Sequence, residues 1–135
     1  MDLEARITFP GGQRVDAELE GRVIPTDQPA SAGGSGSAPE PFALFAASLG
    51  TCAGFYVLRF CQARRLPTQG LAIRQRLRFE DGRLANVELD VELPEGFPEK
   101  YREALVRAAD GCKVKKAIEA QPRFVVRALS AAHAA

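Results

Sequence analysis

Leu44-Phe45-Ala46-Ala47-Ser48-Leu49-Gly50-Thr51-Cys52 is the stretch of sequence that decides the fold. It belongs to a helix that we predict from about residue 41 to residue 65, and Pro41 suits the first turn of that helix. The first half of the helix is apolar on nearly every side, so we expect it to be buried on most sides. Because one small chain has difficulty covering such a helix, the sequence predicts a homodimer.

Strands are predicted on both sides of the long helix, because apolar and polar residues alternate there. Those before the helix cover residues 3–9, 15–19 and 22–24, and those after it cover residues 71–79 and 87–93. Between the third strand and the helix, residues 25–39 are rich in Gly, Ser, Pro and Ala. We interpret this stretch as a loop within one domain, because neither flank has enough residues to fold alone.

The two strands after the helix carry opposite charges, with arginines on one face of the first and acids on one face of the second. A hairpin brings arginine opposite acid only if its loop has an odd number of residues. A three-residue loop over residues 81–83 pairs Arg76 with Glu88 and Arg74 with Asp90. We therefore interpret the arginine face as structural pairing and not as a nucleic-acid surface.

The C-terminal part predicts two more helices and a last strand. One helix starts at Pro98 and ends at Gly111, a short helix follows it, and residues 123–129 predict a strand. The order βββ-α-ββ-αα-β indicates an α+β fold, and we expect residues 1–135 to form a single domain. The Ala-rich end that carries His133 is expected to be frayed.

Composition limits the classes of partner. The net charge of +1 argues against nucleic acid as a partner. We expect no apolar run to cross a membrane, and the start Met1-Asp2-Leu3-Glu4 lacks the basic and apolar regions of a signal peptide. A cytoplasmic protein with no membrane partner is therefore predicted. Three cysteines in such a chain favour reduced thiols over a disulfide framework.

The residue types present exclude several kinds of site. His133 is the only histidine, which argues against Ser-His-Asp and Cys-His mechanisms. One histidine and three isolated cysteines match no closed zinc site, so we predict neither a metal nor another cofactor. Residues 33–37 lack the Gly-Lys-Ser/Thr ending of a phosphate-binding loop and predict a flexible loop. Thiol redox chemistry is left as the main route to catalysis.

The three cysteines differ in their local settings. Cys52 lies within the long helix, where a thiol reacts only if the fold brings a cation to it, and Arg22 is a better candidate for that cation than Arg59. Cys112 opens a helix beside three lysines, a setting that favours a thiolate. Cys61 lies on the opposite helix face from Cys52 and is predicted to be structural. Local features leave open whether Cys52 or Cys112 has a redox role.

Four segments together carry a family resemblance. They are Thr26-Asp27-Gln28-Pro29, Gly33-Gly34, the start of the long helix from Pro41 to Gly54, and Gly111-Cys112. The chain resembles the osmotically inducible protein C and organic hydroperoxide resistance family over nearly its whole length. This resemblance implies the OsmC-like fold, an intertwined homodimer in which antiparallel sheets wrap long central helices. It also implies active sites at the subunit interface.

The resemblance further implies thiol-dependent reduction of organic hydroperoxides. Cys52 matches the peroxidatic cysteine and Cys112 the resolving cysteine of the family. The family uses an arginine of the N-terminal β region to stabilise the thiolate, and Arg22 matches that residue. A glutamate orients the arginine in the family, whereas Phe42 stands at the aligned position and Glu40 lies on the other side of Pro41.

The mechanism that follows is a thiol peroxidase cycle. The Cys52 thiolate attacks a hydroperoxide, Cys112 converts the resulting sulfenic acid to a disulfide, and an external dithiol reduces it. Arg22, a lysine or Arg59 lowers the Cys52 pKa and stabilises the departing alkoxide. The aromatic residues expected to line an apolar pocket for alkyl peroxides are Phe42, Phe45, Phe55 and Tyr56, although each is also explained by core packing.

Two alternatives to this enzyme remain. One is a non-catalytic dimer that binds a small apolar ligand, which the absence of the glutamate favours. The other is a thiol redox sensor that forms the disulfide between Cys52 and Cys112 but turns over slowly.

Overall fold

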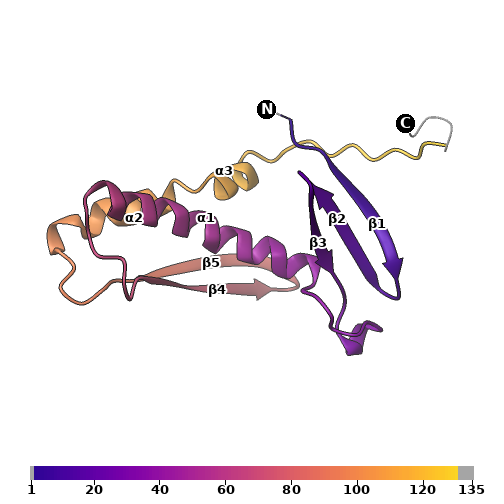
Figure 1. Cartoon of the computed structure of the whole chain (residues 1–135), viewed down its shortest axis with the longest axis horizontal. Coiled ribbons are helices and arrows are strands. Elements are labelled where there is room, and N and C mark those ends of the chain that lie inside the picture. Colours follow the sequence, from indigo (N-terminus) through magenta and orange to yellow (C-terminus); the bar gives the residue numbers. More distant parts are fainter. Residues whose placement is uncertain (1, 131–135) are drawn as a thin grey trace.

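A long helix and two separate antiparallel sheets form the architecture of residues 2–130, the part of the chain that this computed structural model describes (Figure 1). In chain order the elements are β1 (Ala5–Gly11), β2 (Arg14–Leu19), β3 (Arg22–Thr26), η1 (Ala30–Ala32), α1 (Pro41–Ala63), β4 (Ala72–Glu80), β5 (Arg83–Glu92), η2 (Glu99–Tyr101), α2 (Arg102–Asp110) and α3 (Lys113–Glu119). The predicted α+β fold is confirmed.

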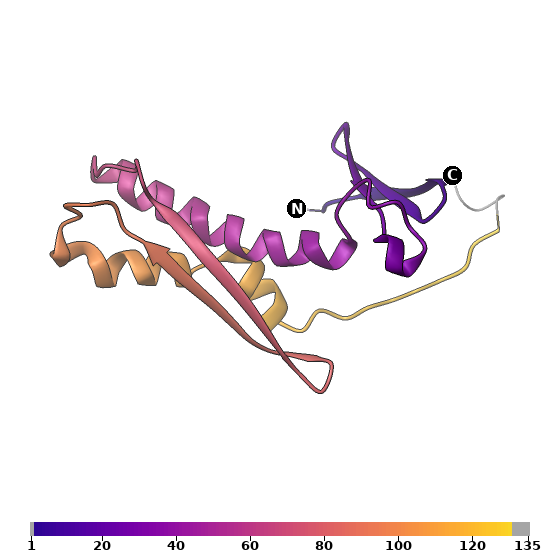
Figure 2. The same cartoon turned by 90° about the horizontal axis from the view of Figure 1, so that it is seen from below.

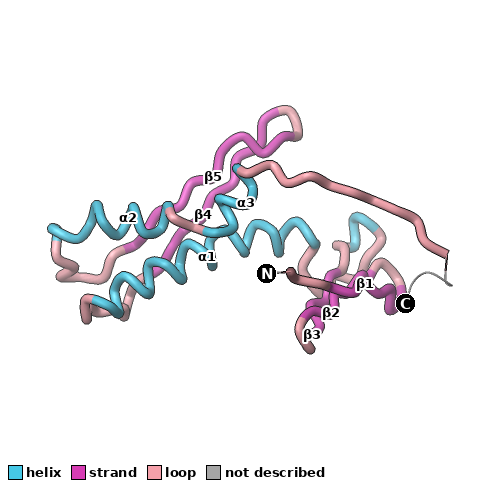
Figure 3. Tube along the Cα trace, turned by 90° about the horizontal axis from the view of Figure 1, so that it is seen from above, coloured by secondary structure: helices cyan, strands magenta, loops and turns pink. Residues whose placement is uncertain are grey.

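Helix α1 lies along the hairpin β4–β5 and also contacts α2 and α3 (Figures 2 and 3). Glycines on α1 let the hairpin approach closely, since a Cβ at Gly50 would stand 2.7 Å from the side-chain oxygen of Gln75. Gln75 fixes the contact, because its Nε2 donates a hydrogen bond to the carbonyl oxygen of Ala46 at 2.9 Å. The small residues of α1 thus position the hairpin.

The core lies where α1 meets α2 and the start of α3. Its buried residues recur on α1 at helical spacing, which places them on one face of that helix. They are Ala53, Val57, Phe60, Cys61, Leu105, Ala109 and Cys112. Cys61 is therefore a core residue, and burial raises the pKa of its thiol.

The hairpin has the predicted pairs but a different turn. Arg76 is opposite Glu88 and Arg74 is opposite Asp90, as the charge pattern requires. The turn, however, consists of Asp81 and Gly82 alone, with φ values of 50° and 74°. Ala85 is a bulge, because Arg78 pairs with Asn86 and Phe79 with Leu84. A two-residue turn plus one bulged residue gives the same alignment of faces as the predicted three-residue loop.

The N-terminal sheet β1-β2-β3 lies near the N-terminal end of α1 (Figure 1). The loop between the sheet and α1, which the sequence predicts to be flexible, is built around Asp27. Its carboxylate accepts hydrogen bonds from the Ser37 hydroxyl at 2.6 Å, the Ser37 N–H at 3.0 Å, the Gln28 N–H at 2.7 Å and the Ser35 hydroxyl at 2.9 Å. These bonds, those from Ser37 above all, hold the pKa of the Asp27 carboxyl well below its usual range.

The predicted last strand is wrong for the isolated chain. Residues 121–130 run as extended chain with no strand pairing, and Phe124 and Val126 are 86% and 96% exposed. A strand needs a neighbouring edge to pair with, and no edge among residues 2–130 pairs with this segment (Figure 1). His133 lies outside the described residues.

The expectation that no apolar run is long enough to cross a membrane is wrong for α1. By length and composition, the 23 residues of α1 would suffice to cross one. The core helix of a soluble protein passes the same test. Only 17% of its most apolar window is buried within this chain, so much of the apolar surface of α1 is uncovered.

Candidate active site

Cys52 and Cys112 come together where α1 meets the start of α3, since Cys112 belongs to the core cluster and Cys52 packs against it. Cys112 follows Gly111, where α2 ends, and it is the N-cap residue of α3. Its sulfur accepts the N–H of Lys115 at 3.5 Å and faces the carbonyl oxygen of Leu49 on α1 at 3.9 Å. Cys52 packs against the same core cluster, and the Cys112 side chain is among the groups that lower the pKa of its thiol. Both cysteines are free thiols.

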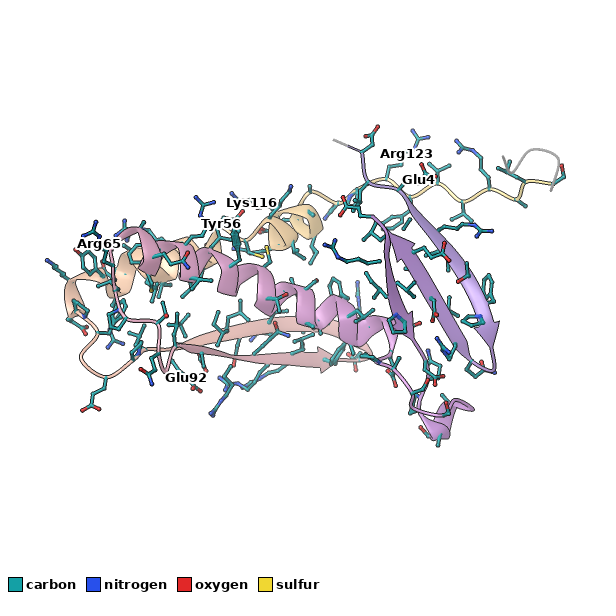
Figure 4. All side chains as sticks on the ribbon, in the orientation of Figure 1. Glu4, Tyr56, Arg65, Glu92, Lys116 and Arg123 are labelled. Atoms are coloured by element: carbon teal, nitrogen blue, oxygen red, sulfur yellow. The ribbon has the colours of Figure 1, made fainter. Side chains whose placement is uncertain are left out.

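The surroundings of Cys52 favour its thiolate. Partial burial opposes ionisation, but the N–H of Val114, the Cys112 thiol, the N–H of Lys113 and the positive charge of Lys113 outweigh it. Together these groups lower the pKa of Cys52 below that of an ordinary thiol. The features that local sequence assigns to Cys112, a helix start and nearby lysines, therefore act on Cys52 across the helix contact. Figure 4 marks Tyr56 on α1 and Lys116 on α3 near the place where these helices meet.

The two arginines considered from the sequence are not brought to Cys52 within one chain. Arg22 begins β3 in the N-terminal sheet, where its side chain is exposed. Arg59 points to another part of α1, with its guanidinium carbon 5.7 Å from the ring centroid of Phe55. The cation that acts on Cys52 in the described chain is Lys113. Sequence analysis named it only as one of several lysines, because its relation to Cys52 depends on how α3 packs.

A large groove lies beside the thiol pair. Its volume is about 960 Å³, and it is bounded by α1, β5, α2 and α3. Cys112 lines this groove, together with apolar residues of β5 such as Leu89 and Val91. Four aromatic residues were predicted to line an apolar pocket, and one of them, Phe45, lines this groove. The groove therefore borders one member of the thiol pair, Cys112, whose side chain is buried.

The other three predicted pocket residues lie elsewhere. Phe42 packs at the start of α1 against Phe45, with ring centroids 5.3 Å apart, and against Phe79 of β4, at 5.7 Å. Phe55 and Tyr56 stack on each other on the exposed side of α1. Phe42, at the position aligned with the glutamate of the resemblance, therefore belongs to an aromatic cluster and not to a polar contact.

Two reduced thiols in one cluster are the groups that dithiol–disulfide chemistry requires. A thiol with a lowered pKa, as at Cys52, is the kind of group that can act as a nucleophile in such chemistry. Within residues 2–130 no group of His, Cys, Asp and Glu side chains is arranged to hold a metal ion.

The model of the OsmC-like protein family matches residues 34–127, which span α1, the hairpin and both cysteines of the thiol pair. The chain belongs to the OsmC-like family. The resemblance to osmotically inducible protein C and organic hydroperoxide resistance proteins is thereby confirmed. No curated protein matches the chain.

Solved structures of other OsmC-like proteins share the fold. One from Psychrobacter arcticus 273-4, described as an osmotic stress induced and detoxification response protein, has a TM-score of 0.68 at 21% identity, with 84% of this chain and 85% of that chain covered. An organic hydroperoxide resistance protein OsmC from Legionella pneumophila has a TM-score of 0.57 at 21% identity, with 87% and 89% covered. At 21% identity, the similarity to these two structures shows a shared fold alone.

A third OsmC-like structure contains a small molecule. It comes from Vibrio cholerae, is described as an organic hydroperoxide resistance protein, and has captopril bound in one of its active sites. Its TM-score is 0.54 at 20% identity, with 87% of this chain and 85% of that chain covered. These three similar chains are thus named for osmotic stress or hydroperoxide resistance.

Proposed function

We propose that this OsmC-like protein is a thiol peroxidase that reduces organic hydroperoxides. The observation that carries the proposal is that Cys52 and Cys112 share one cluster at the start of α3, where the pKa of Cys52 is lowered. A nucleophile with a lowered pKa and a second thiol within reach are the two groups that such a cycle requires. The names of the related structures support the same activity.

The cycle needs three steps. The Cys52 thiolate attacks the outer oxygen of a hydroperoxide, the O–O bond breaks, and the alkoxide takes up a proton to leave as an alcohol. Cys52 is then a sulfenic acid, and the Cys112 thiol displaces water from it to form the disulfide. An external dithiol reduces the disulfide by thiol exchange and is itself oxidised to a disulfide. No metal or further cofactor takes part.

A second copy of the chain would complete the site. Arg22 shares one face of the N-terminal sheet with Leu19, Ala17 and Ile24, because the strand register pairs Leu19 with Arg22 and Ala17 with Ile24. On the same face, Ile7 is 51% exposed, so the apolar side of this sheet is open. Packed against the α1 of a partner, this face would carry Arg22 toward the partner's thiols. There a guanidinium would stabilise the departing alkoxide.

The uncovered surface of α1 supports this homodimer. Phe55, Tyr56 and Leu58 are between 37% and 47% exposed on α1, which is unusual for the most apolar helix of a soluble chain. The extended segment 123–129, whose apolar side chains are exposed, would gain a strand partner in the same assembly. The proposed unit is therefore an intertwined dimer with its two thiol pairs at the subunit interface.

The activity is tested by following the consumption of cumene hydroperoxide in the presence of dithiothreitol. Wild-type protein should turn over repeatedly, and Cys52→Ser should be inactive. Cys112→Ser should consume about one equivalent of peroxide per chain in the absence of reductant, because its sulfenic acid has no resolving thiol. Cys61→Ser is the matched control and should retain activity. A wild-type rate no higher than that of Cys52→Ser would refute the proposal.

The dimer is tested by light scattering on the eluted protein. The expected mass is twice the 14.6 kDa of one chain. Leu58→Glu places a charge on the exposed face of α1 and should shift the mass toward one chain, with loss of turnover. A wild-type mass of one chain over the micromolar range would contradict the assembly.

The apolar groove favours one alternative, a binding protein for a small apolar ligand. Its volume of about 960 Å³ is in the range of ligand pockets, and its walls are largely apolar. The peroxide assay separates the two functions. Saturable binding of a fluorescent fatty acid that is unchanged in Cys52→Ser, in a protein without peroxidase turnover, would favour the binding protein.

A further inference from the structure

We infer that the free edge of β5 is the docking site for the extended segment 123–129 of a second copy of this chain. The docked segment adds a strand to the hairpin and covers the groove on the side that β5 borders. This inference rests on the homodimer of the proposed function, and it names two surfaces that meet there. Neither surface includes Arg22 or the uncovered face of α1.

Strand β5 has an edge without a strand partner. The hairpin is a two-stranded sheet, so β4 pairs with one side of β5 and the other side has no strand beside it within residues 2–130. The side chains of β5 alternate between two faces. Glu88, Asp90 and Glu92 share the face of the β4 arginines, whereas Leu89 and Val91 line the groove. An added strand therefore meets acids on one face and aliphatic side chains on the other.

The segment 123–129 has the complementary alternation. In its extended chain Arg123, Val125 and Arg127 belong to one face, and Phe124 and Val126 to the other. Phe124 and Val126 are almost fully exposed in one chain. Neither arginine forms an ion pair with a carboxylate of residues 2–130. The segment thus has a basic face and an apolar face, both of which lack a counterpart in one chain.

The spacing of the charges sets the register. Arg123 and Arg127 are four residues apart, and so are two of the acids on β5, Glu88 and Glu92. Both arginines can therefore stand opposite a glutamate at the same time. Opposite charges at facing positions of neighbouring strands stabilise the pair, and like charges there destabilise it.

This register also aligns the apolar faces. Val125 and Asp90 are the midpoints of the two charged runs, so they lie opposite each other whether the strands are parallel or antiparallel. Phe124 and Val126 then lie on the face of β5 that borders the groove, where the core helices shield apolar side chains. One register satisfies both the charges and the apolar residues.

The other free strand edges lack this pattern. The charged face of β4 carries Arg74, Arg76 and Arg78, which would place like charges beside the arginines of the segment. Neither β1 nor β3 contains an acidic residue. Among the strand edges of residues 2–130, charge complementarity therefore selects β5.

A second copy is the partner because one sequence supplies both surfaces. Within one chain the segment leaves α3 and runs away from the hairpin toward the N-terminal sheet (Figures 1 and 2). Two copies related by a two-fold axis each donate a strand and each accept one, so the assembly closes at two chains.

Two cysteines at the centre of the proposed contact test the inference. Asp90→Cys combined with Val125→Cys should form a disulfide between chains when the protein is oxidised with diamide. Facing residues of neighbouring strands have α-carbons about 4.5–5.5 Å apart, a separation that a disulfide can span. The expected product on a non-reducing gel has twice the 14.6 kDa of one chain, and dithiothreitol converts it back.

Asp90→Cys combined with Phe124→Cys is the matched control. It has the same number of cysteines, but a shift of one residue moves the second cysteine to the other face of the strand. The control should give at least about fivefold less of the doubled product. Equal yields from the two variants would overturn the inference, as would a disulfide that links the two introduced cysteines within one chain.

A charge reversal provides a second measurement should the cysteine variants fail to fold. Arg123→Glu with Arg127→Glu places acids opposite acids and should raise the concentration at which the dimer dissociates at least about tenfold at low salt. Lys100→Glu with Lys116→Glu makes the same change in net charge at exposed positions outside the contact. Equal dissociation of these two double variants, measured by light scattering on dilution, would overturn the inference.

Cross-linking requires no peroxide, so the docking site and the proposed activity can fail separately. A cross-linked dimer without peroxidase turnover retains the docking site and loses the enzymatic proposal. A dimeric peroxidase whose cysteine variant gives no more doubled product than its control retains the activity and excludes the β5 edge as the docking site.

Discussion

Cys112 caps α3 with its own sulfur, which accepts the N–H of Lys115 at 3.5 Å, and the same sulfur lies 3.9 Å from the carbonyl oxygen of Leu49, one helical turn before Cys52 on α1. The start of α3 also acts on Cys52, because the N–H groups of Val114 and Lys113 are among the causes that lower its pKa. Hydrogen bonds to a sulfur favour its charged form. In the proposed cycle, this arrangement makes Cys52 the nucleophile and Cys112 the second thiol.

Cys52 and Cys61 should differ in their reaction with iodoacetamide, although they lie on the same helix. The pKa of Cys52 is lowered, so its thiolate forms as the pH rises through a value below the ordinary thiol pKa of about 8.5. The pKa of Cys61 is raised by burial, so its thiolate forms only above that value. At pH 7 Cys52 should be modified at least about tenfold faster. Faster modification of Cys61 would contradict this assignment.

Gly50→Ala should leave the protein less stable than Gly54→Ala does. A Cβ at Gly54 meets only Ile73 at 3.7 Å, and alanine favours a helix over glycine by up to about 1 kcal/mol, so Gly54→Ala should be neutral or stabilising. At Gly50 the new methyl would displace the Gln75 amide and break its bond to Ala46. Gly50→Ala should therefore raise the free energy of unfolding by less than Gly54→Ala does, or lower it by about 1 kcal/mol. Urea unfolding measures the free energy of unfolding of both variants. A higher value for Gly50→Ala than for Gly54→Ala would contradict the prediction.

Leu105→Ala should be among the most damaging single substitutions in α2. Leu105 is 1% exposed in the core between α1 and α2, and its truncation leaves a cavity. The expected loss in the free energy of unfolding is about 2–5 kcal/mol. Its neighbour Val106 is 55% exposed, and Val106→Ala should cost less than about 1 kcal/mol. Similar losses for the two variants, measured by denaturant titration, would place the core elsewhere.

Arg76→Gln should cost little, despite two ion pairs. Arg76 contacts Glu88 at 3.2 Å and Asp90 at 2.6 Å, but its side chain is 46% exposed. Exposed ion pairs typically contribute below about 1 kcal/mol, and salt screens them. The effect on the melting temperature should shrink in 1 M NaCl. Arg83→Gln serves as the control, since Arg83 has no ion pair within residues 2–130. A loss for Arg76→Gln that is insensitive to salt would argue for a packing role.

Strand and helix positions were predictable because they depend on periodicity along the chain. The alternation of apolar and polar residues locates strands, and the opposite charges of Arg76 and Glu88 locate their pairing. The turn was not predictable in the same way. Residues 81–83 as a loop, or two turn residues with Ala85 as a bulge, place the same side chains on the same faces.

The parts that sequence analysis missed depend on contacts between elements or between chains. Cys112 was recognised at a helix start, but which sulfur receives the N–H groups and the charge of Lys113 depends on how α3 packs on α1. The strand expected over residues 123–129 has the right composition but no edge to join within residues 2–130. Its apolar residues therefore remain exposed.

The bulge at Ala85 reconciles the tight turn with the charge pairing of this hairpin. If the register of the two-residue turn ran on without a bulge, Arg76 would stand opposite Val87, so that a guanidinium shared a face with an aliphatic side chain. Deletion of Ala85 itself would keep Arg76 opposite Glu88, because Ala85 has no partner on β4. Natural variants should therefore lose this residue more readily than a paired residue such as Val87, whose loss would shift every pair beyond it.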